Sequence, residues 1–140
     1  MADVELPDWI TDHMDRYLAT NGEDGHIWRG VPTLLLTTKG RKSGEPRMLP
    51  LIYGEADDGY VIIASKGGAP SHPAWYLNLD AEPNVELQVG ADKFSGVAQT
   101  VTDERRAGMW ELMTDIWPAY KDYQSHTERQ IPVVLITRHS

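Results

Sequence analysis

Residues 33–53 read TLLLTTKGRKSGEPRMLPLIY and contain the clearest secondary-structure signal of the chain. Its first part, Thr33 to Thr38, is rich in Leu and Thr and has the length of a strand. The run from Met48 to Tyr53 is a second apolar segment of similar length. Residues 40–46 lie between them and contain two glycines and a proline, which is typical of a turn. The stretch therefore predicts two antiparallel strands joined by a short turn.

The rest of the sequence repeats this pattern of short apolar segments separated by turns. Ala56-Asp57-Asp58-Gly59 is a hairpin turn signal, and a second turn is expected near residues 90–93. The expected strands lie at 33–38, 48–53, 60–65, 85–89, 94–101 and 133–137. Because tight turns join several of them, pairing should be mostly antiparallel. The pattern favours an α+β domain with a small β-barrel or a strongly bent sheet.

Three segments carry helical signals. We expect helices at residues 8–20, at residues 72–79 and from residue 103 onward. Asp8 and Thr102 are suitable N-cap residues for the first and the last of these helices. Pro73 fits the first turn of the short helix, whereas Pro118 should break or kink the last one. Residues 22–30 are expected to form a loop.

Length and composition exclude several classes of protein. A chain of 140 residues suits one domain spanning 1–140. Cysteine is absent, so the sequence offers no disulfide and no thiolate nucleophile. The five histidines show no metal-ligand spacing, and we expect no metal site. The acidic N-terminus lacks the apolar core of a signal peptide, and no apolar run has the length of a membrane span. These features favour a cytoplasmic location.

Charge is distributed unevenly along the chain. The net charge of −8 argues against nucleic acid as a partner. Residues 39–47 nevertheless hold four cations and one carboxylate, namely Lys39, Arg41, Lys42, Arg47 and Glu45. A basic island in an acidic chain indicates a local anion site. A solvated turn remains the alternative on these residues alone.

The chemistry of this turn suits an anion. Gly40 and Gly44 can adopt positive φ, so that backbone amides can turn toward a bound oxyanion. Arginine and lysine side chains add charge-assisted hydrogen bonds, and Ser43 adds a hydroxyl. The segment is not a Walker A loop, because the Gly-Lys-Ser/Thr ending and the following helix are missing. It is not a Rossmann fingerprint either.

Two further groups of residues could contribute to a site. Lys66, in Ser65-Lys66-Gly67-Gly68, would join the anion site if strand ends converge, and would otherwise be an exposed lysine. Trp117, Tyr120 and Tyr123 recur every third residue and would share one face of a helix. The tyrosine hydroxyls could orient or protonate a substrate, although a packing stripe explains the same spacing. Trp75 and Tyr76 could pack on a ring system or belong to the core.

Together these segments resemble the deazaflavin-dependent nitroreductase family, the split β-barrel reductases of actinobacteria that use coenzyme F-420. The resemblance runs from about Val31 to Pro132. Four motifs carry it, at residues 34–47, 65–68, 73–79 and 120–124. It implies a split β-barrel of the FMN-binding type, mostly antiparallel, with flanking helices.

The resemblance also implies a cofactor and its contacts. Coenzyme F-420 is an 8-hydroxy-5-deazaflavin with a phosphate and a polyglutamate tail, which suits a basic island. By resemblance, the phosphate and tail would meet Arg41, Lys42, Ser43 and Arg47. The ring and tail would be lined by Met48, Leu49, Pro50, Leu51, Ile52, Ile63, Ala64, Ser65, Lys66, Ala74, Trp75, Tyr76, Leu77, Asn78 and Tyr120.

The implied reaction is hydride transfer from the reduced deazaflavin to a small-molecule electron acceptor, a quinone, nitroaromatic or activated enone. Tyr120, Tyr123 and Ser65 would be the catalytic residues. Trp117, Tyr120 and Tyr123 would form the substrate pocket, with Trp117 at a position where several members have tyrosine. The first 30 residues would cover this pocket or touch a membrane peripherally. Acidic residues there, including Asp3, Glu5 and Asp12, disfavour contact with anionic lipid.

Two alternatives remain open from the sequence. An FMN-dependent split-barrel oxidoreductase would share the fold and the phosphate site, but FMN has no glutamate tail for so many basic groups. In a non-catalytic F-420 carrier, the aromatic stripe would be a packing feature and Lys66 a surface residue. Split-barrel relatives often form homodimers, so a homodimer is a further expectation.

Overall fold

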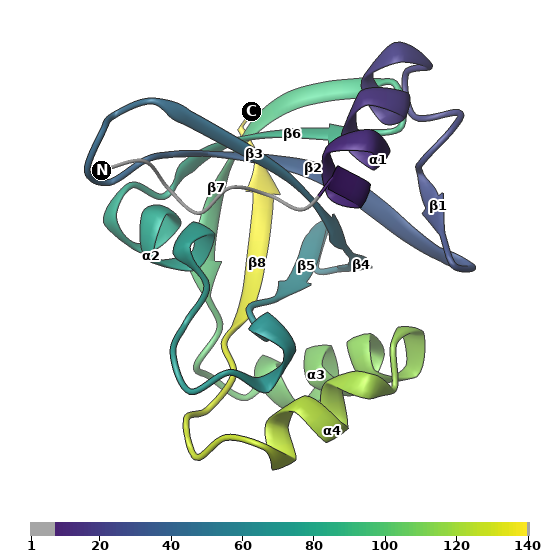
Figure 1. Cartoon of the computed structure of the whole chain (residues 1–140). Coiled ribbons are helices and arrows are strands. Elements are labelled where there is room, and N and C mark those ends of the chain that lie inside the picture. The colour runs from purple at the N-terminus through teal and green to yellow at the C-terminus, as the bar shows by residue number, and fades with distance from the viewer. Residues whose placement is uncertain (1–7, 140) are drawn as a thin grey trace.

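The computed structural model describes residues 8–139 (Figure 1). The predicted acidic positions Asp3 and Glu5 lie outside the described residues. The strands are β1 (Ile27–Trp28), β2 (Val31–Lys39), β3 (Pro46–Ile52), β4 (Gly54–Ala56), β5 (Gly59–Ile63), β6 (Asn84–Val89), β7 (Asp92–Thr100) and β8 (Val133–Arg138). The helices are α1 (Asp8–Ala19), α2 (Ala74–Ala81), α3 (Arg105–Ile116), α4 (Ala119–Ser125) and the 3₁₀ turn η1 (Lys66–Gly68).

The strands form one curled antiparallel sheet. Their order is β1-β2-β6-β7-β8-β5-β4, and β3 pairs with β2 outside this path. In Figure 1, β2, β3 and β6 run across the ends of β5, β7 and β8. The chain passes from β3 almost directly into β4, so the two ends of the curled sheet are joined covalently. The predicted α+β class and mostly antiparallel pairing are confirmed.

The hairpin quoted first forms as predicted. β2 and β3 pair in continuous register from Thr33 opposite Ile52 to Lys39 opposite Pro46. The turn closes through hydrogen bonds from the Gly40 amide to the Glu45 carbonyl, 2.8 Å, and from the Gly44 amide to the Gly40 carbonyl, 2.7 Å. Gly44 has a φ of +75°, which explains glycine at this position.

The second predicted hairpin differs from the expectation. Residues 48–53 were expected to pair with residues 60–65, but β3 pairs with β2 and a separate strand, β4, pairs with β5. The break falls at Tyr53, whose amide donates to the Pro32 carbonyl at 3.2 Å and so stays with β2. Asp57 and Asp58, at φ of +50° and +59°, form the tight turn that the sequence indicated.

Other element boundaries shift by a few residues. β5 ends at Ile63, and the expected strand residue Ser65 instead precedes η1. α2 begins at Ala74, because Pro73 has an extended backbone with ψ of 153°. α3 begins at Arg105, whose amide donates to Asp103 Oδ1 at 3.0 Å. The predicted break at Pro118 occurs, between α3 and α4. The expected loop 22–30 contains the short strand β1, which is too brief to show a sequence pattern.

Two apolar clusters fix the layers that surround the site. One fills the curled sheet beneath α2 and includes Leu34, Trp75 and Ile136. The other packs α3 and α4 on β5 and β8 and includes Met113 and Tyr120. No helix within residues 8–139 is long and apolar enough to cross a membrane.

The first helix is tied to the sheet by a buried hydroxyl. Tyr17 is fully buried, and its hydroxyl accepts from the Gly90 amide at 2.7 Å. The same hydroxyl lies 3.1 Å from the Thr33 carbonyl and 3.2 Å from the Gln88 carbonyl, to which it donates. α1 is therefore anchored to β2 and to the β6–β7 turn, which sets where its first turns lie.

Candidate functional site

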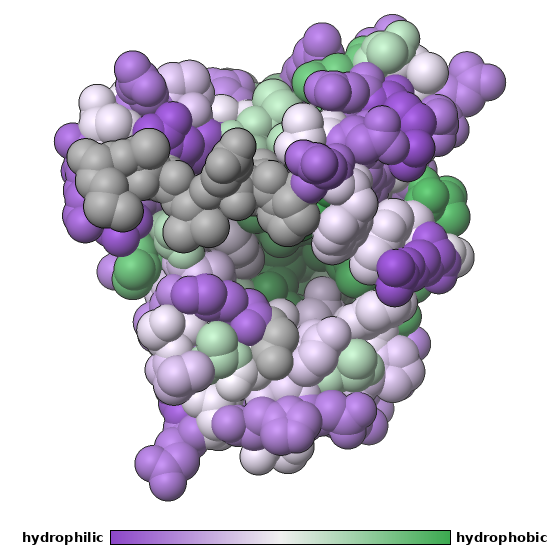
Figure 2. Space-filling model, in the orientation of Figure 1, coloured by the Kyte–Doolittle hydropathy of each residue, from purple (hydrophilic) through white to green (hydrophobic). Residues whose placement is uncertain are grey.

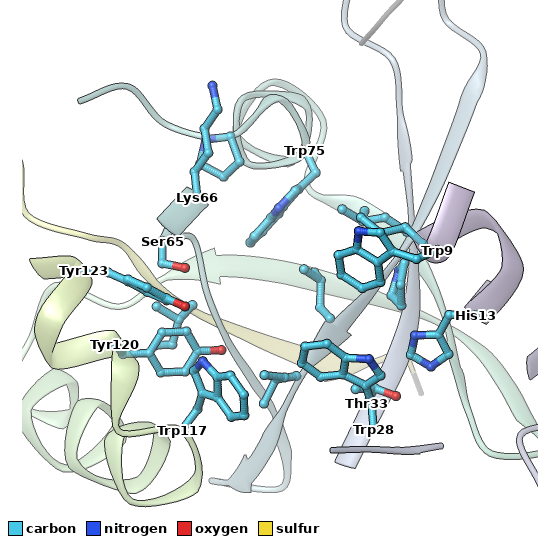
Figure 3. A pocket seen from close by; sticks show the side chains of 17 residues that line it. Trp9, His13, Trp28, Thr33, Ser65, Lys66, Trp75, Trp117, Tyr120 and Tyr123 are labelled. Atoms are coloured by element: carbon cyan, nitrogen blue, oxygen red, sulfur yellow. The ribbon is translucent and has the colours of Figure 1, made fainter. Parts of the chain in front are cut away.

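A cavity of about 530 Å³ lies between the curled sheet and the helices. Figure 2 shows it as a hollow with an apolar floor, and Figure 3 shows its walls. It is lined by Trp9, Ile10, His13, Trp28, Thr33, Leu49, Pro50, Leu51, Ile52, Ile63, Ser65, Lys66, Pro73, Trp75, Trp117, Tyr120 and Tyr123. Most of these side chains are apolar or aromatic, as is usual for pockets that bind small ligands and cofactors.

Many of the predicted site residues meet in this cavity although they come from four separate parts of the chain. β3 supplies Leu49 to Ile52, the end of β5 supplies Ile63, and Ser65 and Lys66 follow it. α2 contributes Trp75. Trp117, Tyr120 and Tyr123, the predicted substrate pocket, come from the α3–α4 junction and α4. The curled sheet brings these four parts of the chain together.

Other predicted cofactor residues do not line the cavity. Met48 lines a second groove together with Leu35 and Leu87. Ala64 is fully buried, and the Tyr76 hydroxyl hydrogen-bonds Thr100 Oγ1 at 2.8 Å. Ala74, Leu77 and Asn78, together with Arg41, Lys42, Ser43 and Arg47, also lie outside the cavity wall.

An aromatic wall from the first 28 residues was not among the predicted site residues. Trp9 stacks on Trp28 with ring centroids 5.8 Å apart and an interplanar angle of 13°. The ring centroid of Trp28 in turn lies 5.7 Å from that of Trp117. His13 also stacks on Trp28, with ring centroids 6.5 Å apart. The three tryptophans thus link α1, β1 and the α3–α4 junction across one side of the cavity (Figure 3). The helical spacing of Trp9 and His13 was the available signal, but it did not show what they face.

The two tyrosines of α4 lie at the opposite wall. Their rings meet edge to face with centroids 6.1 Å apart, and both hydroxyls point into the cavity in Figure 3. Tyr120 is 5% exposed. Burial, and next the neighbouring Tyr123, raise the pKa of Tyr120. Tyr120 therefore stays protonated at neutral pH and can donate a hydrogen bond to a polar group in the cavity.

Ser65 and Lys66 form the rim between these tyrosines and α2. Lys66 has a φ of +47°, a left-handed conformation that is uncommon for a residue with a side chain. Its ammonium group points away from the cavity in Figure 3 and lies 3.5 Å from Ser71 Oγ. Lys66 therefore presents its stem to the cavity and its charge to the outer rim.

The basic turn adjoins the cavity through α2. Asn78 is buried, and its Oδ1 accepts from the Arg41 amide at 3.2 Å and from Arg41 Nη1 at 2.8 Å. Arg41 Nη1 also lies 3.5 Å from the carbonyl of Ala74, which stands between the cavity residues Pro73 and Trp75. The Asn78 side chain thus holds the turn beside the cavity, although Asn78 does not line the cavity.

The cations of the turn differ in their exposure. Arg41 and Lys42 are exposed. Arg47 Nη2 donates to Ser43 Oγ at 3.3 Å, and its Nη1 lies 3.7 Å from Glu45 Oε2. In the described part of the chain, no three His, Cys, Asp or Glu side chains gather to hold a metal ion.

Comparison with known proteins gives this arrangement a context. The sequence family "F420H(2)-dependent quinone reductase" matches residues 9–138. An F420H(2)-dependent quinone reductase of Mycobacterium tuberculosis is 44% identical over 126 residues, which cover 87% of this chain and 85% of that protein.

Solved structures agree with the sequence comparison. A structure of an F420-H2 dependent reductase is 40% identical with a TM-score of 0.70, and covers 79% of this chain and 97% of that one. A domain-swapped dimer is 38% identical with a TM-score of 0.73, and covers 92% of this chain and 97% of that one. A candidate pyridoxamine 5′-phosphate oxidase from Listeria innocua, 14% identical with a TM-score of 0.54, covers 90% and 93% and shares the fold alone. The predicted split β-barrel is confirmed.

Proposed function

The chain belongs to the F420H(2)-dependent quinone reductase family, and on this premise we propose that it transfers a hydride from reduced coenzyme F-420 to a quinone. The observation that carries the proposal is the adjacency of an apolar, aromatic-lined cavity and an exposed cationic turn. The first suits a planar ring system and the second suits an anionic tail. A site for a neutral ligand would need the apolar cavity but not the cationic turn.

The residues present fit this cofactor. The cavity volume of about 530 Å³ lies within the range of small-ligand sites, roughly 300–1,000 Å³. Leu49 to Ile52 supply an apolar strand against which a flat ring can lie, and Trp75 faces them from α2. Arg41 and Lys42 supply donors for a phosphate and carboxylates beyond the cavity's edge. When bound, the cofactor supplies the hydride, and the protein positions it and shields it from water.

The acceptor would occupy the side of the cavity that the aromatic residues line. Trp9, Trp28 and Trp117 present flat apolar surfaces that suit a quinone ring. Tyr120 and Tyr123 would direct their hydroxyls at an acceptor oxygen, and either could donate the proton that accompanies the hydride. Ser65 would hold a polar group at the rim. A nitroaromatic or an activated enone has similar shape and polarity and would compete for the same space.

Activity is tested by mixing the purified protein with reduced coenzyme F-420 and menadione and following the return of the oxidised cofactor's fluorescence. Oxidation that requires both protein and menadione is the expected result. Tight binding without menadione-dependent oxidation would favour a carrier. Binding of FMN in preference to coenzyme F-420 would favour the FMN-dependent alternative.

The cationic turn is tested separately by cofactor titration. Lys42→Ala should weaken binding of coenzyme F-420 because it removes an exposed cation from the proposed tail site. Lys93→Ala removes an exposed cation from β7 and serves as the matched control. Equal affinities in the two variants would argue against this turn as the tail site.

The homodimer expected from the sequence stays a proposal for this chain. It is supported by the similar protein that forms a domain-swapped dimer. Trp9, Leu18 and Ile27 are exposed large apolar residues that a second copy could cover. Light scattering on the eluting protein would give its mass in solution, and a monomer at every concentration tested would exclude the dimer.

A further inference from the structure

Arg129 lies in the segment between α4 and β8 and makes an unusual set of contacts. Its Nε donates to the Ala69 carbonyl at 2.8 Å and its Nη2 to the Ser65 carbonyl at 2.7 Å. Its Nη1 donates to the Ala64 carbonyl at 3.2 Å and to His72 Nδ1 at 3.0 Å. All four acceptors belong to residues 64–72, the segment that carries the cavity rim.

None of these partners is a carboxylate. Within residues 8–139 Arg129 forms no ion pair, so its contacts use the planar fork of the guanidinium rather than charge neutralisation. A guanidinium can serve four acceptors in one plane, whereas an ammonium cannot. His72 must present an unprotonated Nδ1, because Arg129 can only donate.

The segment that Arg129 holds is strained and closely packed. Lys66 keeps its left-handed φ of +47° there. On the opposite side, Gly68 packs against α4 so closely that an added Cβ would lie 2.5 Å from the Tyr123 carbonyl oxygen. The rim is therefore held between Arg129 and the backbone of the helix that carries the cavity tyrosines.

The backbone of Arg129 is fixed by that same helix. Gln124 of α4 donates from Nε2 to the Arg129 carbonyl at 2.8 Å. Its Oε1 accepts from the Ile131 amide at 3.0 Å. A continuous set of hydrogen bonds thus runs from α4 through Gln124 and Arg129 to Ser65, and joins two walls of the cavity.

We propose that Arg129 is a positioning residue, which holds Ser65 and Lys66 in the conformation that the cofactor meets. The proposal rests on the proposed function for its ligand, but its structural part concerns the free protein. Loss of the fork should release the strained backbone of Lys66 and detach the rim from α4. Cofactor binding should then weaken, although Arg129 itself does not line the cavity.

The test compares Arg129→Lys with Arg106→Lys. Arg106 is the matched control, because it is also partly buried and its Nη2 donates to the Ile131 carbonyl at 2.6 Å, without contact to residues 64–72. In the free protein, amide exchange is followed at Gly68 and Ala69, whose amides donate to Ser65 and Lys66 carbonyls at 2.9 and 3.1 Å. Binding of coenzyme F-420 is measured by fluorescence titration.

We expect Arg129→Lys to speed exchange at Gly68 and Ala69 and to weaken cofactor binding by about tenfold. Arg106→Lys should leave both measurements at the wild-type values. Arg129→Gln, which keeps an amide donor but loses the charge and the fork, should behave like Arg129→Lys. Unchanged exchange and affinity in Arg129→Lys, or equal effects in Arg106→Lys, would overturn the proposal. If the wild type does not bind the cofactor, the proposed function fails, while the exchange measurement still decides the role of Arg129.

Discussion

Tyr120 and Tyr123 are three residues apart on one helix and line the same cavity, but they differ in burial. Tyr120 is almost fully buried between the helices and β8, whereas Tyr123 is half-buried at the rim. The raised pKa of Tyr120 makes it a poor acid but a reliable hydrogen-bond donor at neutral pH. We therefore expect the two hydroxyls to have different roles.

Replacing each tyrosine by phenylalanine removes the hydroxyl and keeps the ring. We expect Tyr120→Phe or Tyr123→Phe to lower turnover with menadione by about tenfold or more, because the acceptor loses a hydrogen bond from Tyr120 or a proton donated by Tyr123. Coenzyme affinity should change little, since the ring still lines the cavity. Steady-state turnover and fluorescence titration check the two halves of this prediction. Wild-type turnover in both variants would show that the tyrosine hydroxyls do not assist the reaction.

His72 gives a prediction about pH and stability. Burial, and next the charge of Arg129, lower the pKa of His72, while Asp80 opposes the shift. As the pH falls past about 6.5, the unfolded chain binds this proton more readily than the folded one. The contribution of His72 to the free energy of unfolding should therefore decrease from pH 7.5 toward pH 5.

Chemical denaturation at several pH values measures that decrease. His72→Asn retains an acceptor for Arg129 and cannot be protonated in this range, so its unfolding free energy should depend less on pH. The two proteins share every other titratable group, so the difference between their curves isolates the contribution of His72. Parallel pH curves for the two proteins would show that His72 is not responsible.

At the scale of elements, the short strand β1 has an effect beyond its length. Its two residues pair with Val31 and Pro32 at the start of β2, and this places Trp28 between Trp9 and Trp117. Arg29 also lies over the Trp28 ring, with its guanidinium carbon 4.7 Å from the ring centroid. β1 therefore sets the position of the aromatic wall, although Tyr17 anchors the far end of α1.

Trp28→Leu tests this arrangement. The substitution removes the aromatic ring that lies between α1 and Trp117. Amide hydrogens in the first turns of α1 should therefore exchange faster with solvent, and the Michaelis constant for menadione should rise several-fold. Each aromatic pair lost contributes about 0.5–1.5 kcal/mol. Phe94→Leu, on β7 and lining a different groove, is the control. An unchanged Michaelis constant for menadione would place the acceptor elsewhere.

For the whole molecule, the contrast between an acidic chain and one basic turn has a measurable consequence. Most of the surface should repel an anionic cofactor, since the net charge is −8, while Arg41 and Lys42 attract it locally. Exposed charges are screened over about 10 Å at 0.1 M salt. We expect the dissociation constant of coenzyme F-420 to rise as potassium chloride increases from 50 to 500 mM.

The control for this salt effect is the 8-hydroxy-5-deazaflavin chromophore without its phosphate and tail. Its affinity should be weaker and nearly independent of salt, because the cavity that would hold it is mainly apolar. Equal salt dependence for both ligands would contradict a tail site at the basic turn.

The local features of this protein follow from short sequence patterns. Gly40, Gly44 and Pro46 specified the turn between β2 and β3, and the cations around them specified a basic island. Pro118 separated α3 from α4. These signals are readable because turn chemistry and charge act between neighbours in the chain. The resemblance of four ordered motifs then gave the split barrel and the family.

Several contacts that shape the cavity have no counterpart in the local sequence. Trp28 came from a segment with no strand pattern, and the hydrogen bond from Arg41 to the buried Asn78 had no signal in the local sequence. Arg129 carried no signal at all, since its partners lie about 60 residues away in the sequence. Contacts of this kind form only when the sheet curls, and local pattern does not encode them. The β-hairpin of residues 33–53 was thus readable in advance, and the network that shapes the rim beside it was not.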